Sequence, residues 1–184
     1  NGYRFWGHQR IGVQPDIVTM GKPMGNGHPV AGVVTSAEIM AEFRHSFRYF
    51  NTFGGNPVSC AAALAVLDVL EDENLQENAR LVGAHAKAGL RELAKKHHSI
   101  GDVRGCGLFF GAEMVTDRAT KAPASEYVVR VVNEMRARGV LMNKLGVHYN
   151  TLKLRPPMPF SIDNSEQMLE TLDHVLSDLG PADE

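Results

Sequence analysis

One lysine of the sequence stands where a strand-like run gives way to a glycine-rich turn. Residues 17–20 are apolar or favour β-structure, and Lys22 follows them between Gly21 and Gly25. An amine at the rigid end of a strand can attack a carbonyl to form an imine, and neighbouring glycines let the backbone approach a bound group closely. Most lysines in turns, however, are solvated surface groups. The segment by itself is compatible with a reactive lysine or with an ordinary exposed turn.

A second segment, residues 50–60, has the composition of an anion site. Thr52 and two glycines precede Asn56 and Pro57, which suit the N-cap and the first turn of a helix. Unpaired amide donors and the helix dipole at such an N-terminus favour phosphate, and Thr52 is the natural hydroxyl ligand. The alternative is an ordinary capped helix start.

Together, the two segments make the chain resemble the class III aminotransferases, which are pyridoxal-phosphate enzymes of fold type I. The resemblance extends over nearly the whole chain and rests on residues 5–7, 15–22, 50–57, 101–108 and 152–157. Within the family, residues 50–60 and 101–108 look most like the alanine–glyoxylate aminotransferase 2-like group, which includes amino-alcohol phosphate phospho-lyases.

The resemblance implies an α/β fold in three parts. Residues 1–72 would be the C-terminal part of the fold type I large domain, residues 73–98 an interdomain helix, and residues 99–184 a small α+β domain. Family members usually run to more than twice this length, and the chain begins just after their Asp-Glu-x-Gln motif. We therefore expect the N-terminal half to be missing, and with it the carboxylate that pairs with the pyridine nitrogen.

The resemblance also assigns roles to individual residues. Lys22 forms the Schiff base (internal aldimine) with pyridoxal 5'-phosphate, and Thr52 binds the cofactor phosphate across a dimer interface, which implies a homodimer or a larger assembly. Many members bind the substrate α-carboxylate with an arginine three residues before the Pro-Pro pair, a position held here by Lys153. Alternation along a strand puts Arg155 on the same face as Lys153, so we expect the pair to bind substrate. The alternative is that one of them is a structural ion-pair partner.

The activity expected of the full-length parent is transfer of an amino group from an amine or amino acid to a keto acid. Lysine in place of arginine at position 153 is also compatible with a phospho-lyase acting on a phosphorylated amino alcohol. A third possibility is an inactive fragment or a dimerisation module. The 184-residue chain alone is expected to be inactive.

Hydrophobic periodicity places the helices and strands. Residues 58–70 are apolar nearly all round, which is typical of a buried helix, whereas the apolar residues of 75–93 recur every three or four positions and predict a one-faced helix. Residues 103–115 alternate as a half-buried strand, and residues 126–138 and 164–179 predict two further one-faced helices. Residues 116–124 are polar and predict a loop.

Composition excludes several other functions. With 43% hydrophobic residues, 22% charged residues and a formal net charge of −2, the chain lacks the basic character of proteins that bind nucleic acid or an anionic membrane. No apolar stretch approaches the roughly 20 residues of a transmembrane helix. Cys60 and Cys106 are expected to be buried thiols in a reducing, cytoplasmic compartment. The histidines and cysteines show no metal-ligand spacing, so no metal site is expected.

Overall fold

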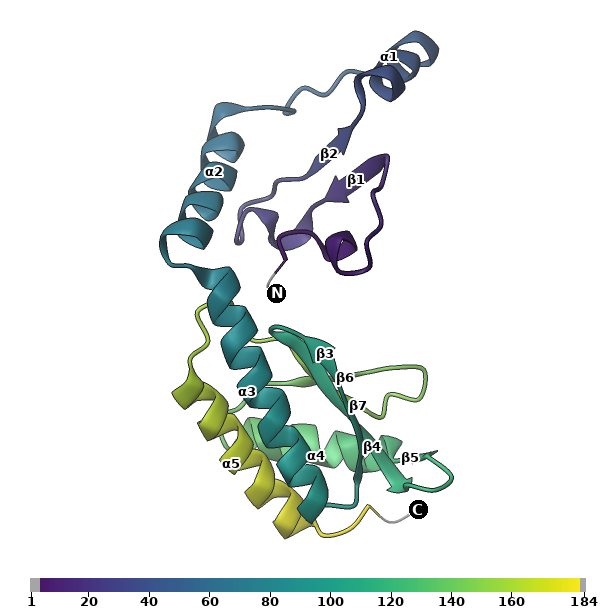
Figure 1. Ribbon diagram of the computed structural model, residues 1–184, viewed down its shortest axis with the longest axis vertical. Helices are drawn as coiled ribbons and strands as arrows, with labels where there is room; N and C mark the ends of the chain where they lie inside the picture. Colours follow the sequence, from purple (N-terminus) through teal and green to yellow (C-terminus); the bar gives the residue numbers. More distant parts are fainter. Residues whose placement is uncertain (1–3, 183–184) are drawn as a thin grey trace. The chain divides into compact units, whose positions relative to one another are not determined.

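The computed structural model describes residues 4–182, which form two compact units, residues 4–75 and residues 76–182 (Figure 1). Each unit is described separately. Both contain helices and antiparallel strands, the mixed architecture that the sequence predicted.

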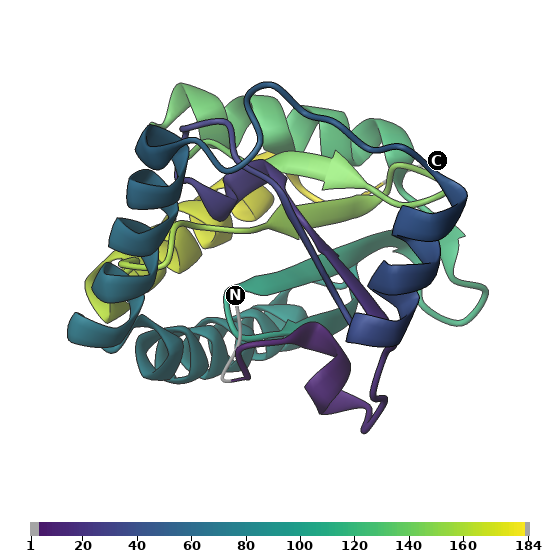
Figure 2. The ribbon, with the colours of Figure 1, turned by 90° about the horizontal axis from the view of Figure 1, so that it is seen from above.

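The N-terminal unit is built around one antiparallel strand pair. It contains η1 (Gly7–Arg10), β1 (Ile17–Met20), η2 (Lys22–Met24), β2 (Gly32–Thr35), α1 (Ala37–Ser46) and α2 (Pro57–Asp72). β1 and β2 run side by side with Ile17 opposite Thr35 and Met20 opposite Gly32 (Figure 2). The register ends at Met20, so the glycine-rich segment 21–31 is the connection between the paired strands.

The apolar helix predicted over residues 58–70 exists as α2, but the prediction that it is buried is wrong. Val58 and Leu64 are 69% and 59% exposed, and within residues 4–75 the one buried hydrophobic side chain is Leu75. A two-stranded ribbon and a ten-residue helix are too small to cover every side of a 16-residue apolar helix. The apolar pattern of residues 58–70 identifies side chains for which burial is favourable, but residues 4–75 do not bury them.

The C-terminal unit has its own core. It contains α3 (Leu75–Lys96), β3 (Ile100–Cys106), β4 (Phe109–Asp117), β5 (Ala122–Pro123), α4 (Ser125–Ala137), β6 (Asn143–Leu145), β7 (Thr151–Leu154) and α5 (Ile162–Leu179). The strands form an antiparallel sheet in the order β3-β4-β7-β6, with β5 paired to the outer part of β4.

One face of this sheet is apolar and the other is polar. Alternate residues of β4 and β7 are buried together with residues from all three helices in a single cluster: Ala79, Val82, Ala86, Leu90, Phe110, Ala112, Met114, Val128, Val131, Met135, Leu152, Leu154, Met168, Leu172, Val175 and Leu176. The sequence pattern of all three helices is confirmed, because their periodic apolar positions are the ones that enter the core.

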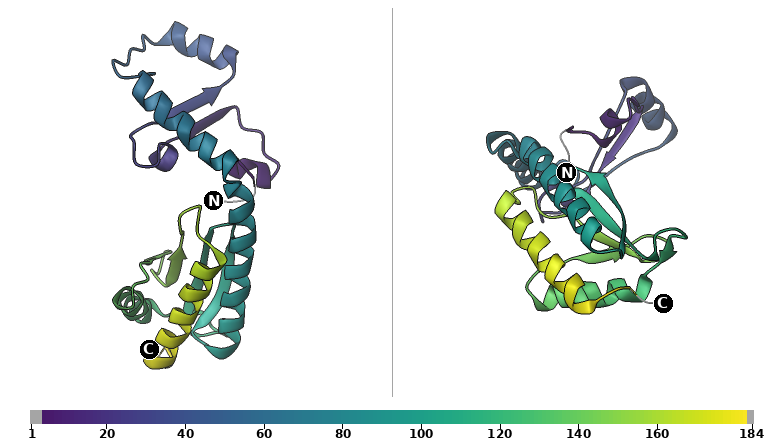
Figure 3. Two further views of the ribbon diagram at one scale, coloured as in Figure 1. Left: turned by 90° about the vertical axis from the view of Figure 1, so that its left-hand side faces the viewer. Right: turned by 60° about the horizontal axis from the view of Figure 1, so that its bottom comes forward.

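Side-chain contacts also join the C-terminal end of α3 to α5. α3 and α5 lie side by side (Figure 3), and at the C-terminal end of α3 both Lys96 and His97 contact Asp173 of α5. The sequence assigned residues 73–98 to an interdomain helix. The apolar face of α3 belongs to the core of the C-terminal unit.

The single strand predicted over residues 103–115 is wrong in one respect, because the chain reverses at Gly107 and Leu108. Gly107 has φ 52, a left-handed conformation that glycine adopts without steric cost, and it closes the β3–β4 hairpin. A Cβ atom on Gly83 of α3 would lie 2.1 Å from the Gly107 carbonyl oxygen, so α3 approaches this turn through a glycine. Part of the predicted loop 116–124 also pairs with β4 as β5.

Candidate active site

Lys22 lies in a tightly bonded turn directly after β1. Its φ is 51, and a non-glycine residue in this left-handed region costs about 1–2 kcal/mol. The turn is held by backbone hydrogen bonds from Met24 N to Gly21 O (3.3 Å), from Asn26 N to Pro23 O (2.9 Å) and from His28 N to Gly25 O (3.0 Å). The Lys22 side chain is exposed, and no described residue forms an ion pair or hydrogen bond with its amine. An unpaired amine on a strained, rigid turn suits attachment of a cofactor aldehyde.

Thr52 begins the turn that leads into α2. The turn closes with a hydrogen bond from Gly54 N to Asn51 O (3.2 Å), and Asn56 caps α2 by accepting from Ser59 N at 2.9 Å, as the sequence predicted. Pro57 occupies the first helical position. The Thr52 hydroxyl is exposed and has no hydrogen-bond partner among the described residues. A free hydroxyl ahead of the N-terminus of a 16-residue helix fits a phosphate group.

The structure connects the Lys22 turn with the Thr52 turn. His28 Nε2 lies 2.9 Å from Ser59 Oγ in the first turn of α2, although the two residues are 31 positions apart. Sequence reasoning missed this contact. Both residues are polar and able to form a side-chain hydrogen bond, but nothing in the sequence indicates that the Lys22 turn and the start of α2 lie next to each other.

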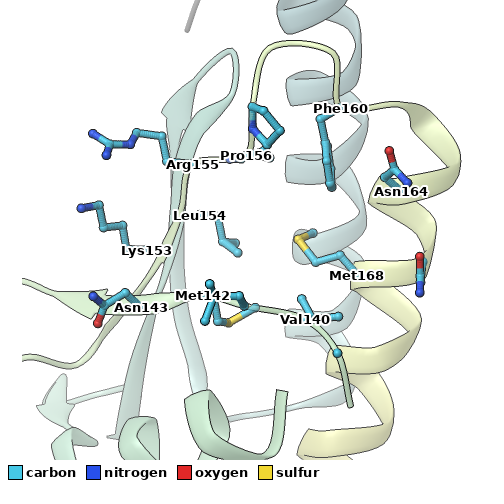
Figure 4. A pocket seen from close by; sticks show the side chains of 14 residues that line it. Val140, Met142, Asn143, Lys153, Leu154, Arg155, Pro156, Phe160, Asn164 and Met168 are labelled. Atoms are coloured by element: carbon cyan, nitrogen blue, oxygen red, sulfur yellow. The ribbon is translucent and has the colours of Figure 1, made fainter. Parts of the chain in front are cut away.

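The two predicted substrate residues lie in the C-terminal unit and project together. Lys153 is in β7, paired with Gly111 of β4 and Asn143 of β6, and Arg155 follows the end of the strand. Both side chains extend to one side of the strand while Leu154 extends to the other (Figure 4). Lys153 is half-buried and Arg155 is exposed.

Among residues 4–182, neither cation has an acidic partner. No carboxylate of the described residues forms an ion pair with Lys153 or Arg155. In contrast, Arg104 of β3 bonds both Asp102 (2.8 Å) and Glu113, and these carboxylates raise the pKa of its guanidinium, Asp102 having the larger effect. Arg104 is thus committed to structure, whereas the charges of Lys153 and Arg155 remain available to an anion.

A pocket of about 530 Å³ lies between β7, residues 139–143 and the start of α5. Its apolar wall is formed by Leu154, Met142, Phe160 and Met168, on the side of β7 opposite to the two cations (Figure 4). The chain after Arg155 is anchored to α3, because Asn78 Nδ2 donates to the carbonyls of Met158 (2.7 Å) and Phe160 (3.0 Å). These two hydrogen bonds fix the segment that follows Arg155.

The prediction that both cysteines are buried is wrong. Cys60 is exposed and Cys106 is half-buried, and both are free thiols. Cys60 lies on α2, so it shares the exposure of that helix. Within residues 4–182, no group of three or more histidine, cysteine, aspartate or glutamate side chains is arranged to hold a metal ion. The same described residues include no helix with the length and apolar character needed to cross a membrane.

Comparison with known proteins decides the family. Residues 3–176 match the profile of the family described as Aminotransferase class-III. The chain belongs to the class III aminotransferases. Pyridoxal 5'-phosphate is the cofactor of this family, and the free amine of Lys22 together with the hydroxyl and helix N-terminus at Thr52 fits its aldehyde and its phosphate.

Similar proteins include both transferases and lyases. An ethanolamine-phosphate phospho-lyase homolog of Caenorhabditis elegans is 45% identical over 179 residues, which cover 96% of this chain and 38% of the relative. An alanine–glyoxylate aminotransferase 2 homolog of Arabidopsis thaliana is 46% identical over 173 residues, covering 94% of this chain and 36% of the relative. This class III chain therefore spans little more than a third of the length of these relatives.

Solved structures similar to this chain also include both a lyase and a transaminase. An Arthrobacter phospholyase in complex with phosphoethanolamine superposes with a TM-score of 0.92 and 43% identity over 95% of this chain and 42% of the other. A PLP-bound amine transaminase from an uncultivated Pseudomonas species gives a TM-score of 0.85 and 31% identity over 97% of this chain and 43% of the other. The class III fold is thus shared with enzymes of two reaction types.

Proposed function

We propose that the whole protein containing this chain is a pyridoxal-phosphate-dependent aminotransferase that moves an amino group from a small amine or amino acid to a keto acid. The observation that carries this proposal is the unpaired amine of Lys22 on a left-handed turn at the end of β1, within a segment that matches the class III family. The cofactor, when bound, supplies an aldehyde that condenses with amines and a ring that accepts electrons.

Lys22 has two roles in this proposal. Its Nζ would hold the aldehyde group of the cofactor. Once free, the same Nζ would be the group that takes up and returns the proton at the substrate carbon that bears the amine. The turn hydrogen bonds around Lys22 fix the backbone from which the side chain carrying Nζ projects.

Thr52 and the N-terminus of α2 hold the cofactor phosphate in this proposal. The Thr52 hydroxyl would donate to a phosphate oxygen, and the N-terminus of α2 would add the favourable field of the helix dipole. By resemblance to the family, Thr52 serves the cofactor of a partner subunit, so we propose a homodimer or a larger assembly.

Lys153 and Arg155 bind the anionic part of the substrates. A keto acid and an amino acid each carry a carboxylate, and Arg155 can bind a carboxylate with two parallel hydrogen bonds while Lys153 adds a point charge. Their shared side of β7, and the lack of a carboxylate partner for either of them among the residues that the structure describes, support this role.

A second candidate is elimination of phosphate from a phosphorylated amino alcohol. Lys153 stands where many class III enzymes have arginine, and one similar solved structure is a phospholyase in complex with phosphoethanolamine. A phosphate group carries close to two negative charges at neutral pH, which suits two adjacent cations. In this reaction the same Lys22 Nζ would remove the proton, and phosphate would leave from the neighbouring carbon.

Fixation of the cofactor and product analysis test both candidates. The whole protein, loaded with pyridoxal phosphate, is treated with borohydride and its peptides are mapped. We expect the label on Lys22, and loss of the visible cofactor band in Lys22→Ala. Lys121→Ala is the matched control, because Lys121 is also an exposed lysine with positive φ (59). A label on another lysine of a protein that binds the cofactor well would refute the assignment.

Substrates then separate the two reactions. Phosphoethanolamine that yields inorganic phosphate identifies the lyase. Alanine and glyoxylate that yield pyruvate and glycine without phosphate release identify the aminotransferase. The isolated chain, purified without the rest of the protein, is expected to be inactive in both assays.

A further inference from the structure

A short series of side-chain hydrogen bonds links the Lys22 turn to the Thr52 turn. His28 lies at the far end of the turn that carries Lys22, where its N–H donates to Gly25 O at 3.0 Å. Gly25 and His28 approach so closely that a Cβ on Gly25 would lie 2.3 Å from the His28 carbonyl oxygen. The backbone of His28 is therefore held in this turn, and the Nε2 atom of its imidazole contacts Ser59 Oγ at 2.9 Å in a partly buried position.

Ser59 is connected to the Thr52 turn through hydrogen bonds of Asn56. Asn56 Nδ2 donates both to Ser59 Oγ (3.0 Å) and to the carbonyl of Phe53 (2.8 Å), the residue after Thr52. Ser59 N in turn donates to Asn56 Oδ1 at 2.9 Å. A hydroxyl has two lone pairs and one proton, so Ser59 Oγ can bond Asn56 and His28 at the same time.

Little else within this unit fixes one turn against the other. The β1–β2 pairing ends at Met20 and Gly32, so the sheet does not restrain residues 21–31. Apolar packing does not replace it, because Leu75 is the one buried hydrophobic side chain among residues 4–75. Where packing is weak, directional hydrogen bonds decide the relative position of two loops.

We propose that His28 is a positioning residue which, through Ser59 and Asn56, holds the Lys22 turn and the Thr52 turn as one rigid unit and thereby sets the affinity for the cofactor. This inference rests on the proposed function, since it takes Lys22 and Thr52 as the residues that hold the aldehyde and the phosphate. Because Thr52 serves the partner subunit's cofactor in the proposed function, the same series of bonds connects two neighbouring cofactor sites of the dimer.

The test combines hydrogen exchange with cofactor titration in the whole protein. Exchange of the backbone amides of residues 21–28 and 51–56 is measured without cofactor, and the dissociation constant of pyridoxal phosphate is measured from its visible absorbance. In His28→Ala we expect faster exchange in both turns and a dissociation constant raised roughly three- to ten-fold, the effect of one ordinary hydrogen bond.

Three further variants make the expectation specific. Ser59→Ala should reproduce the effect of His28→Ala, and the double variant should add little to either single change, because both remove the same contact. His28→Gln should restore much of the affinity, since its amide nitrogen has about the reach of imidazole Nε2. His45→Ala is the control, because His45 lies exposed on α1 and no described residue bonds its ring.

The outcomes distinguish this inference from the proposed function. A Lys22-dependent visible band in the wild type, with exchange at residues 51–56 and cofactor affinity both unchanged in His28→Ala, would overturn the positioning role. Additive effects of the two single variants would also overturn it. If instead the wild type shows no such band while His28→Ala still loosens both turns, the positioning role of His28 is supported and the proposed cofactor site is refuted.

Discussion

The two free cations near the end of β7 lead to a quantitative prediction about substrate charge. A hydrogen bond to a charged group contributes about 1.5–3 kcal/mol, and about 1.4 kcal/mol corresponds to a tenfold change. Lys153 is half-buried and Arg155 is exposed, so solvent screens Arg155 more strongly. We expect Lys153→Ala to lower kcat/KM for an anionic amine by roughly 100-fold and Arg155→Ala by roughly 10-fold.

The assay compares two amines in the whole protein. Phosphoethanolamine carries an anion, whereas a neutral amine of similar size does not, so only the first should lose reactivity when a cation is removed. Arg136→Ala is the control, because Arg136 is an exposed arginine on α4 for which no ion pair with a described residue is found. Lys153→Arg should retain most of the preference for the anionic amine, since it keeps the charge.

Two results would refute this reasoning. Equal losses with both amines would show that Lys153 and Arg155 support the structure of β7 and do not bind an anion. Full activity of both alanine variants with phosphoethanolamine would show that the anion binds elsewhere in the protein.

Two further predictions concern the C-terminal unit. Lys96 and then His97 lower the pKa of Asp173, so its contribution is present above the unfolded pKa of about 3.9 and is lost as the pH falls through the lower folded value. Asp173→Asn should therefore cost about 1 kcal/mol of unfolding free energy at pH 7 and flatten the acid dependence of urea denaturation, whereas the exposed Glu170→Gln should do neither. Leu90 is fully buried, so Leu90→Ala should cost about 2–5 kcal/mol by the same measurement, and a loss below 1 kcal/mol would contradict the described core. Leu81→Ala on the exposed side of the same helix is its control.

The sequence predicted the helices of the C-terminal unit well because each of them buries a periodic apolar face within that unit. The same reasoning failed for α2. An apolar helix surface indicates that burial is favourable, but it does not indicate which segment buries it. The β3–β4 turn was missed because a glycine inside an alternating pattern reads equally well as part of a strand.

The candidate site was predictable to the extent that it depends on local order. Strand alternation correctly placed Lys153 and Arg155 on one side, and the Asn56 cap followed from residue type. Whether a carboxylate faces a given cation depends on contacts between distant segments, which no local pattern encodes. The His28–Ser59 contact was hidden for the same reason. The roles of Lys22, Thr52, Lys153 and Arg155 in catalysis and binding stay predictions.

The contrast between the two cores has a consequence for how the protein acquires its structure. Residues 76–182 enclose a continuous apolar cluster and can fold as a cooperative unit of their own. Residues 4–75 bury almost no hydrophobic side chain internally, so the entropy lost on ordering them must be offset by surface from outside this segment. We therefore expect the two units to differ in order of folding. The segment with the Lys22 and Thr52 turns would be ordered last, and would be the first to be cut by a protease when its cover is lost.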